Sequence, residues 1–262
     1  MSRIANTFAT LKAAQRIALI PYVVVGQPSL AATPALVSAL IEAGADLVEL
    51  GVPFSDPLAD GPVIQRATHH ALLQGVTPRD CLAAARQVRA RQPHTPLLFM
   101  GYYNPILRFG VDAYARACAE AGVDGLIVPD LPLEESGELE TACRAHAIDL
   151  IFLLAPTSDE SRVAAVARRA SGFIYCVSVV GVTGARHALS DEVEALVTVI
   201  RRHSDLPVAI GFGISQPEHV QQVARFADGA VVGSALVDVI ARAPAGHEAA
   251  AAAAYWQTLT AA

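Results

Sequence analysis

Two carboxylates, Glu49 and Asp60, are the side chains of this sequence best placed for acid–base chemistry. Glu49 belongs to an apolar run at residues 45–50 that predicts a short interior strand, and Asp60 lies in the loop beyond it. Three prolines and two glycines at residues 51–62 give this loop a defined path. Partial desolvation at a strand end should raise the pKa of Glu49, whereas Asp60 in a wetter loop should ionise more readily. The pair is a candidate proton donor and acceptor; the alternative is two solvated carboxylates beside a turn.

Small residues after later apolar runs form a candidate phosphate site. Gly213, Gly233 and Ser234 lie just beyond predicted strands, and Gly184 could join them from a further loop. Glycine lets the backbone approach a ligand closely, and free N–H groups at the start of a helix bind oxyanions. On the alternative interpretation, these glycines only allow the chain to leave a strand.

Apolar and aromatic side chains at strand ends could line a pocket, although such residues singly are more often part of the core. The loop at residues 181–184 could close as a lid or be an ordinary mobile loop. Together these features predict a phosphorylated substrate with an apolar part. Two carboxylates would then catalyse proton transfer or carbon–carbon cleavage without a cofactor. The candidate pocket residues are Tyr22, Met100, Tyr102, Tyr175 and Phe212.

Eight short apolar runs alternate with helical segments, a pattern typical of parallel strands that are covered on both faces. About eight βα units in 262 residues predict an α/β fold, a (β/α)₈ TIM barrel, with its active site at the C-terminal ends of the strands. An open doubly wound sheet is the alternative, but no G-x-G-x-x-G motif follows the first strand. The predicted strands are residues 18–25, 47–50, 97–101, 125–128, 149–154, 173–178, 207–211 and 229–232.

No linker or low-complexity boundary divides the chain, so we interpret residues 1–262 as a single barrel domain. Two extra helices are expected at its ends. The first fifteen residues predict one that closes the bottom of the barrel, and the alanine run at residues 249–254 predicts a terminal helix that packs on the barrel. A weak repeat at residues 42–46 and 120–124, Glu-Ala-Gly-x-Asp, precedes two of the strands, as a repeated βα unit would require.

Several residues mark predicted helix ends. Thr33, directly before a proline, predicts an N-cap with proline at the first helical position. Ser215 and Glu218 have the spacing of a capping box. Gly44 and Gly122 are expected to end the helices before them.

Composition narrows the class of partner. The net charge of −6 argues against nucleic acid or an anionic membrane, because both require a basic face.

The four cysteines are widely spaced, which favours reduced thiols in a cytoplasm over a disulfide framework or a metal site. His69, His70 and Asp80 also lack metal-like partners. The N-terminus has no signal-peptide segment, and prolines break the uncharged stretch at residues 17–41, so a strand, a turn and a helix are expected there.

The motifs of this sequence resemble those of the tryptophan synthase alpha subunit family. The block at residues 47–62, Leu-Val-Glu-Leu-Gly-Val-Pro-Phe-Ser-Asp-Pro-Leu-Ala-Asp-Gly-Pro, matches the family signature closely. The resemblance implies a cytoplasmic lyase of tryptophan biosynthesis, which cleaves indole-3-glycerol phosphate by a retro-aldol reaction to indole and D-glyceraldehyde 3-phosphate. Further matching motifs follow in the same order at residues 102–105, 128–132, 178–184, 211–215 and 233–235.

The resemblance also implies a role for each candidate residue. Glu49 would deliver a proton to indole C3 so that the C3–C1′ bond can break, and Asp60 would take the indole N–H proton. Thr183 would contact Asp60 when the lid closes. The remaining implied substrate contacts are Tyr22, Met100 and Phe212 around the indole ring, Tyr175 beside the carboxylates, and Gly184, Gly213, Gly233 and Ser234 at the phosphate.

Family members work as αββα complexes, in which indole passes through a tunnel to a beta subunit that holds pyridoxal phosphate. The resemblance therefore implies a beta partner and no cofactor in this chain. The residues that match the surface meeting beta are Pro53, Asp56, Asn104 and Pro132. The sequence departs from the family at Val179 and Val180, where members often carry a polar residue, and this departure bears on lid closure.

Alternative functions remain open at this point. Another phosphate-binding barrel, such as phosphoribosylanthranilate isomerase or indole-3-glycerol phosphate synthase, is one. The synthase would rely on a catalytic lysine at a strand end, whereas the only lysine here is Lys12, in the predicted N-terminal helix. A stand-alone lyase of the same family is a second, and a catalytically silent activating subunit is a third, which the intact Glu49 and Asp60 pair disfavours.

Overall fold

Nine short parallel strands form one sheet in the computed structural model, which describes residues 2–177, 186–211 and 213–260, without the side chains of residues 186–190. Their order is β5-β4-β3-β2-β1-β9-β8-β7-β6. The edge strands β5 and β6 follow each other in the chain, so the sheet curls into a nearly closed barrel. The predicted (β/α)₈ TIM barrel is confirmed. The strands are β1 (Ala18–Val24), β2 (Val48–Gly51), β3 (Leu97–Met100), β4 (Gly125–Ile127), β5 (Asp149–Ile151), β6 (Leu153–Leu154), β7 (Ile174–Val177), β8 (Val208–Gly211) and β9 (Gly229–Val232).

The strand predicted at residues 149–154 is divided in two at Phe152. The Phe152 carbonyl accepts a hydrogen bond from the Tyr175 N–H at 3.0 Å, so the chain stays attached to β7 where it passes from one edge of the sheet to the other. The ends of the other seven strands lie within one residue of the predicted ends.

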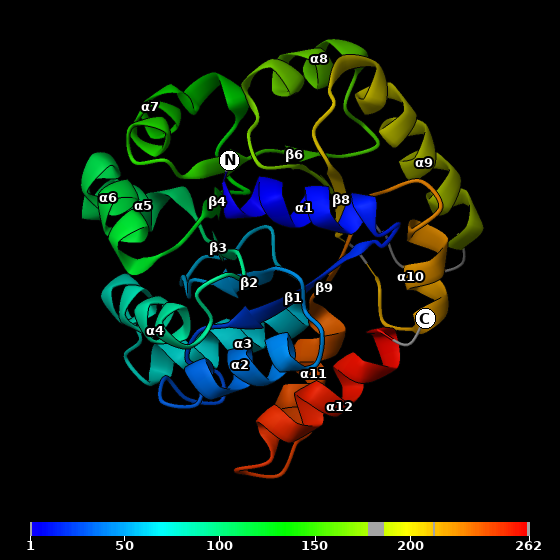
Figure 1. Cartoon of the computed structure of the whole chain (residues 1–262). Helices are drawn as coiled ribbons and strands as arrows, with labels where there is room; N and C mark the ends of the chain where they lie inside the picture. The colour runs from blue at the N-terminus through cyan, green and yellow to red at the C-terminus, as the bar shows by residue number, and fades with distance from the viewer. Residues whose placement is uncertain (1, 178–185, 212, 261–262) are drawn as a thin grey trace.

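Helices surround the strands on the outside of the barrel (Figure 1). Their apolar residues face the strands, which are buried on both sides, as the continuous apolar runs predict. The helices that follow the strands are α2 (Thr33–Glu42), α3 (Pro62–Leu73), α4 (Pro78–Arg91), α5 (Tyr103–Phe109), α6 (Val111–Ala121), α7 (Gly137–Ala145), α8 (Glu160–Arg169), α9 (Arg186–His203), α10 (Pro217–Val223) and α11 (Ser234–Arg242), with a short 3₁₀ turn at Leu133–Glu135.

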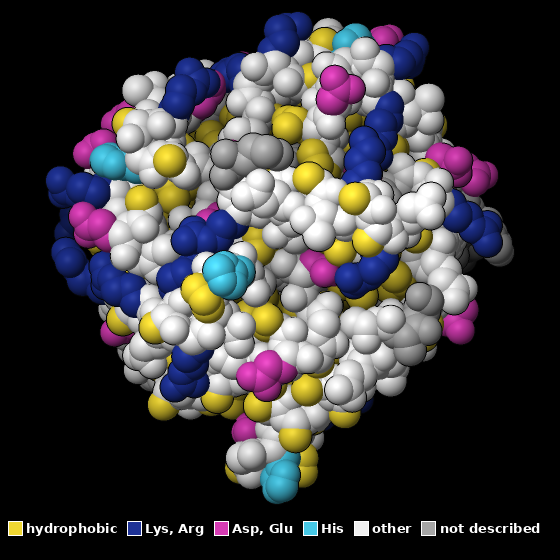
Figure 2. Space-filling view, viewed as in Figure 1, with side chains coloured by type: hydrophobic (Ala, Val, Ile, Leu, Met, Phe, Trp, Pro, Cys, Tyr) yellow, Lys and Arg dark blue, Asp and Glu magenta, His cyan; other side chains and the backbone are white. Residues whose placement is uncertain are grey.

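The two extra helices are present as predicted. Helix α1 (Arg3–Ala13) lies across the end of the barrel where the strands begin (Figure 1). Its Phe8 ring packs 5.6 Å from the ring of Phe173, which directly precedes β7. Helix α12 (Glu248–Thr260) packs against α2 and α11 and buries Trp256 completely. On the face of the barrel that α1 covers, Lys and Arg side chains lie in separate groups with Asp and Glu between them (Figure 2).

At three places in the barrel, an aspartate just before the start of one strand forms hydrogen bonds with the preceding strand. Each aspartate N–H donates to the carbonyl of a residue at the beginning of the neighbouring strand, and its Oδ2 accepts the N–H of the same residue. Two of the aspartates end the repeated Glu-Ala-Gly-x-Asp segments, so the repeat marks a structural joint. The three pairs are Asp46 with Leu19, Asp124 with Leu97, and Asp228 with Val208, with N–H to Oδ2 distances of 2.9, 2.8 and 2.7 Å.

Arginines neutralise these aspartates at the closed end of the barrel. Asp124 is the most buried, with 6% of its side chain exposed, and pairs with Arg3 of α1 at 2.8 Å and with Arg89 of α4 at 2.6 Å. Arg89 also donates to the carbonyl of Gly122. A buried carboxylate needs such partners, because an unpaired charge would be strongly destabilising there.

Two of the predicted helix caps are wrong and two are confirmed. Thr33 is the first residue of α2, not its cap, because its hydroxyl donates to the Ser29 carbonyl and accepts the Gly26 N–H. Helix α10 has Gln216 as its N-cap without a side-chain cap bond, so the capping box of Ser215 and Glu218 does not form. Gly44 and Gly122 follow their helices with positive φ angles of 101° and 79°, as expected of terminating glycines.

All four cysteines are buried free thiols. Among the described residues, no helix is both long and apolar enough to cross a membrane, and no group of three or more His, Cys, Asp or Glu side chains could hold a metal ion.

Candidate active site

Glu49 lies in the middle of β2, beside β1 and β3 in the barrel wall. The parallel register places it opposite Tyr22 of β1 and Leu98 of β3. Side chains that are opposite each other in a parallel sheet point to the same face. The loop that carries Asp60 leaves the C-terminal end of β2, so the fold brings the two predicted carboxylates to the same mouth of the barrel.

Glu49 is 1% exposed, and neither of its carboxyl oxygens has a hydrogen-bond partner among the described residues. Burial, together with the smaller effect of the nearby Asp60 charge, raises its pKa to about 8. A carboxyl group in this state is protonated at neutral pH. Glu49 therefore has the protonation required of a general acid.

Asp60 is only partly buried, and its pKa is raised to about 6, less than that of Glu49. Burial is the larger cause, and the Tyr102 hydroxyl opposes it by favouring the ionised carboxylate. At neutral pH, Asp60 is therefore mostly ionised while Glu49 is mostly protonated. The order of the two pKa values is the one that the sequence predicts.

Gly51 and Gly211 leave the space that two tyrosine side chains occupy. A Cβ atom on Gly51 would lie 2.2 Å from the Tyr22 hydroxyl oxygen, and one on Gly211 would lie 2.0 Å from that of Tyr175. Both tyrosines are almost fully buried. Burial raises the pKa of each phenol, and the charge of Glu49 contributes in both cases. The two rings therefore stand close to the candidate acid, and their positions depend on glycine in neighbouring strands.

Three of the predicted phosphate residues lie in the loops after β8 and β9. Gly213 is exposed and has a φ of 62°, a conformation that favours glycine. Gly233 is the N-cap of α11, and Ser234 is the first residue of this nine-residue helix. The N–H groups of the first turn have no intrahelical partner and can bind an oxyanion. A Cβ on Gly233 would lie 3.8 Å from the Tyr22 Cβ, so this helix start adjoins β1 and the candidate site.

The structure locates most, but not all, of the remaining predicted residues. Met100 is the last residue of β3 and is partly exposed. Pro53 is buried at the base of the β2–α3 loop, whereas the other three predicted partner contacts are exposed; these are Asp56, Asn104 and Pro132. The residues that lie outside the described part of the chain are Thr183, Gly184 and Phe212, with Val179, Val180 and the rest of the predicted lid.

Tyr102 is the residue whose importance the sequence did not reveal. The sequence indicated only a candidate pocket wall at the end of a strand. In the structure its hydroxyl accepts the Ala59 N–H at 3.0 Å, which attaches it to the residue directly before Asp60. A tyrosine at a strand end was the only available signal, because contact with a loop more than forty residues away depends on the fold.

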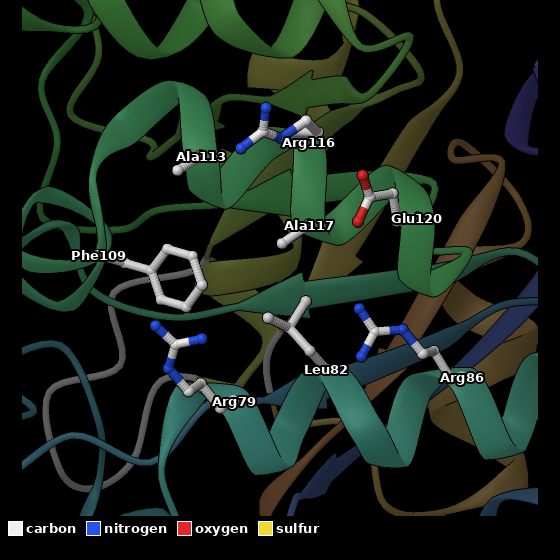
Figure 3. Close-up of a pocket in the computed structure, with 8 residues that line it drawn as sticks. All are labelled: Arg79, Leu82, Arg86, Phe109, Ala113, Arg116, Ala117 and Glu120. Carbon is white, nitrogen blue, oxygen red and sulfur yellow. The ribbon is translucent and has the colours of Figure 1, made fainter.

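A hollow of about 390 Å³ lies away from this mouth, between α4 and α6 on the outside of the barrel (Figure 3). The Arg79 guanidinium lies 5.0 Å from the centre of the Phe109 ring at one end of it. The hollow contains neither candidate carboxylate, and its arginines are exposed. The candidate site is therefore placed at the barrel mouth. The residues that line the hollow are Arg79, Leu82, Arg86, Phe109, Ala113, Arg116, Ala117 and Glu120.

The chain is similar to known proteins along almost its whole length. A family model described as tryptophan synthase alpha chain matches residues 8–261. A tryptophan synthase alpha chain from Chloroflexus aurantiacus is 53% identical over 259 residues, covering 99% of this chain and 97% of that protein. One from Geobacter sulfurreducens is 52% identical over 242 residues, covering 92% and 91%.

Solved structures give the same result at lower identity. Tryptophan synthase subunit alpha from Legionella pneumophila superposes with a TM-score of 0.90 at 38% identity, covering 99% of this chain and 97% of that one. A structure of Mycobacterium tuberculosis tryptophan synthase gives a TM-score of 0.91 at 41% identity, covering 99% and 97%.

Proposed function

This chain belongs to the tryptophan synthase alpha chain family, and from that premise we propose which of its residues carry out the family reaction. The reaction is the retro-aldol cleavage of indole-3-glycerol phosphate to indole and D-glyceraldehyde 3-phosphate in tryptophan biosynthesis. The observation that carries the assignment is the pair of carboxylates at the barrel mouth, with Glu49 protonated and Asp60 ionised at neutral pH.

Proton transfer to the indole ring is the first step. Glu49 gives its proton to indole C3 while Asp60 takes the proton from the indole nitrogen. The ring then has a C2–N double bond that can accept electrons. The buried surroundings of Glu49 favour this step, because a carboxyl group without hydrogen-bond partners holds its proton at neutral pH and presents it only to the substrate.

Cleavage and recovery follow from the same two groups. Glu49, now ionised, takes the proton of the C1′ hydroxyl; the C3–C1′ bond breaks as the C1′ carbonyl forms, and its electrons move into the ring. Asp60 returns its proton to the indole nitrogen. Both carboxyl groups are then as they began, so the step needs no external acid, base or redox partner. This chemistry supports the proposal that the chain requires no cofactor.

The substrate is held by its two ends in this proposal. Backbone N–H groups at Gly213, Gly233 and Ser234 bind the phosphate, because a helix start and a glycine with positive φ both present free donors. Tyr22 and Met100 enclose the indole ring, and Tyr175 lies beside Glu49. Gly184, Thr183 and Phe212, assigned from the family resemblance, complete the phosphate site, the lid and the indole pocket.

A beta subunit is the partner implied by the family, and we propose that it binds at the exposed loop after β2. Leu58 at the tip of this loop is 91% exposed, beside Asp56. A groove of about 690 Å³ between this loop and α3 includes Phe54, Pro57 and Leu73, and Leu73 is 75% exposed. Apolar exposure of this kind is typical of a protein-binding surface. We propose an αββα assembly in the cytoplasm, with Pro53, Asn104 and Pro132 also at the interface and pyridoxal phosphate in the beta subunit.

Indole release from indole-3-glycerol phosphate tests the proposal, measured for the purified chain with and without a beta subunit. Slow release that accelerates with beta is expected, since partner binding should order the loop that carries Asp60. Fast release that beta does not change would indicate a stand-alone lyase. Asp60→Asn and Glu49→Gln should each lower turnover on the order of 100-fold or more, and normal turnover in either variant would remove that residue from the mechanism.

A further inference from the structure

The hollow between α4 and α6 gathers positive charge on the outside of the barrel. Its volume of about 390 Å³ is near the lower end of the range of about 300 to 1,000 Å³ that is typical of ligand pockets. Three arginines line it, Arg79 and Arg86 from α4 and Arg116 from α6, against one acidic residue, Glu120. Lys and Arg side chains gather at the left edge of Figure 2, the side on which α4 and α6 lie in Figure 1. The hollow is thus a local excess of positive charge in a chain with a net charge of −6.

The spacing of the lining residues along the two helices explains why they meet. Side chains three, four and seven positions apart share one face of a helix, and α4 and α6 pack side by side. Arg79, Leu82 and Arg86 rise from α4 toward α6 (Figure 3). The arrangement therefore follows from the sequences of two adjacent helices. Helix α4 contributes residues 79, 82 and 86, and α6 contributes residues 113, 116, 117 and 120.

The three guanidinium groups have no carboxylate partner in the described part of the chain. Neither Arg86 nor Arg116 makes a side-chain hydrogen bond or an ion pair there, and Arg79 makes only its contact with a ring. Arg89, also on α4, is different, because it pairs with the buried Asp124 at 2.6 Å. Like charges that line one hollow repel each other, and their N–H donors are available to a ligand. An anion in the hollow would relieve the repulsion and use these donors.

Arg79 is held at one end of the hollow by an aromatic pair. Its guanidinium lies 5.0 Å from the centre of the Phe109 ring. The other partner of this ring is Tyr114 of α6, which is 3% exposed, with 5.4 Å between the ring centroids and 76° between the ring planes. A guanidinium that rests on a ring still presents its N–H donors in its own plane. Arg79 is therefore partly ordered before any ligand arrives.

We propose that this hollow binds a phosphate dianion, either free or as the phosphate group of a small organic ester. Arginine binds phosphate through paired N–H donors. A tetrahedral phosphate presents oxygens in several directions, which suits guanidinium groups from two helices better than a planar carboxylate does. Leu82, which is 3% exposed, and the alanines at positions 113 and 117 give the hollow an apolar wall. The site lies apart from the phosphate site at the barrel mouth, so this proposal does not rest on the proposed function.

Nitrogen-15 NMR of the arginine side chains would detect binding at this hollow separately from binding at the barrel mouth, where the proposed phosphate contacts are backbone N–H groups. The Nε–H signals of Arg79, Arg86 and Arg116 would be followed in the full-length protein as inorganic phosphate or glycerol 2-phosphate is added. Potassium chloride at equal ionic strength is the reference. All three signals should move on one saturable curve with phosphate and not with chloride. Tighter binding of the ester would identify an organic phosphate as the preferred ligand, and equal binding would identify free phosphate as sufficient.

Single substitutions at exposed positions distinguish a site from a general effect of surface charge. Arg86→Gln and Arg116→Gln should each weaken phosphate binding about tenfold, the loss expected for a hydrogen bond between charged groups. Glu120→Gln removes a carboxylate from the hollow and should tighten binding. Arg91→Gln, exposed on α4 but outside the hollow, is the matched control and should bind as the wild type does. Signals that never saturate, equal shifts with chloride, or an equal loss in Arg91→Gln would overturn the proposal.

Discussion

Glu49→Gln should make the folded protein more stable, and increasingly so as the pH rises. Glutamine has nearly the same shape but cannot ionise. In the wild type, burial raises the pKa of Glu49 from 4.5 to about 8. Below pH 4.5 the group is protonated in both the folded and the unfolded chain and contributes no difference. As the pH rises through this value, the unfolded chain loses the proton first, which favours unfolding until the pH passes about 8.

The size of the effect follows from the difference between the two pKa values. At about 1.4 kcal/mol for each pH unit, the free energy of unfolding of Glu49→Gln should exceed that of the wild type by about 2 kcal/mol at pH 6 and about 3 kcal/mol at pH 7. The gain should level near 5 kcal/mol above pH 8 by the same relation. In a protein of this size, about 3 kcal/mol corresponds to a rise in Tm of roughly 6 °C or more.

Thermal or urea unfolding at pH values from 4.5 to 9 would measure this difference directly. Glu192→Gln, at an exposed position on α9, controls for the loss of one negative charge. A Glu49→Gln protein that is less stable than the wild type at pH 7 would refute the reasoning. A gain that did not vary with pH would do the same, because desolvation of an ionisable group must produce a pH-dependent term.

Three further predictions concern the reaction and the fold. The kcat/KM for indole-3-glycerol phosphate should be highest between about pH 6 and 8, falling below this range as Asp60 protonates and above it as Glu49 ionises; steady-state kinetics against pH would measure it. Gly211→Ala should push the ring of Tyr175 away from Glu49, because the new Cβ would lie 2.0 Å from its hydroxyl oxygen. Indole release should fall and stability should drop by about 1–3 kcal/mol, measured by turnover and urea unfolding. Asp124→Ala should lower the free energy of unfolding by about 3–5 kcal/mol, because it leaves Arg89 without its buried partner, and the urea midpoint would report it.

Each of these predictions has its own control. A flat pH profile between 5 and 9 would remove the two carboxylates from the rate-determining chemistry. Gly61→Ala places a Cβ where no atom lies within 4 Å, so it should leave Tyr175 undisturbed; equal losses in both variants would contradict the steric argument. Asp112→Ala removes an exposed carboxylate from α6, and a loss equal to that of Asp124→Ala would show that burial of the pair contributes little.

The strands were predictable because a parallel strand covered on both faces needs an uninterrupted apolar run, and few other segments in this chain have one. Glu49 stood out for the same reason, as a carboxylate within such a run. The helix caps were less predictable. Thr33 has the right residue type, but its hydroxyl bonds to Ser29 and Gly26 instead, and local sequence does not reveal which of several nearby partners a hydroxyl will choose.

The features of the site and fold that the sequence did not predict depend on contacts between segments that are distant in the sequence. The hydrogen bond between the Ala59 N–H and the Tyr102 hydroxyl needs β2 and β3 to be adjacent, with their loops turned toward each other. The repeated turn that ends in Asp46 and Asp124 was visible as a pattern, but its role as a reciprocal pair of hydrogen bonds required the register of the strands. The lid residues lie outside the described part of the chain, so their predicted roles stay predictions.

The aspartate joints and helix α1 are confined to the end of the barrel where the strands begin, whereas the carboxylates, the tyrosines and the phosphate glycines occupy the opposite end. Evolution and engineering can therefore act on the two ends separately. Loops at the mouth can be exchanged or lengthened to suit another phosphorylated substrate without loosening the joints that keep the barrel closed. Conversely, a change at a joint, for instance at the Asp46 and Arg16 pair, whose charged atoms are 3.6 Å apart, should alter the stability of the barrel without moving the catalytic groups. A barrel organised in this way can tolerate the destabilising side chains that its chemistry demands.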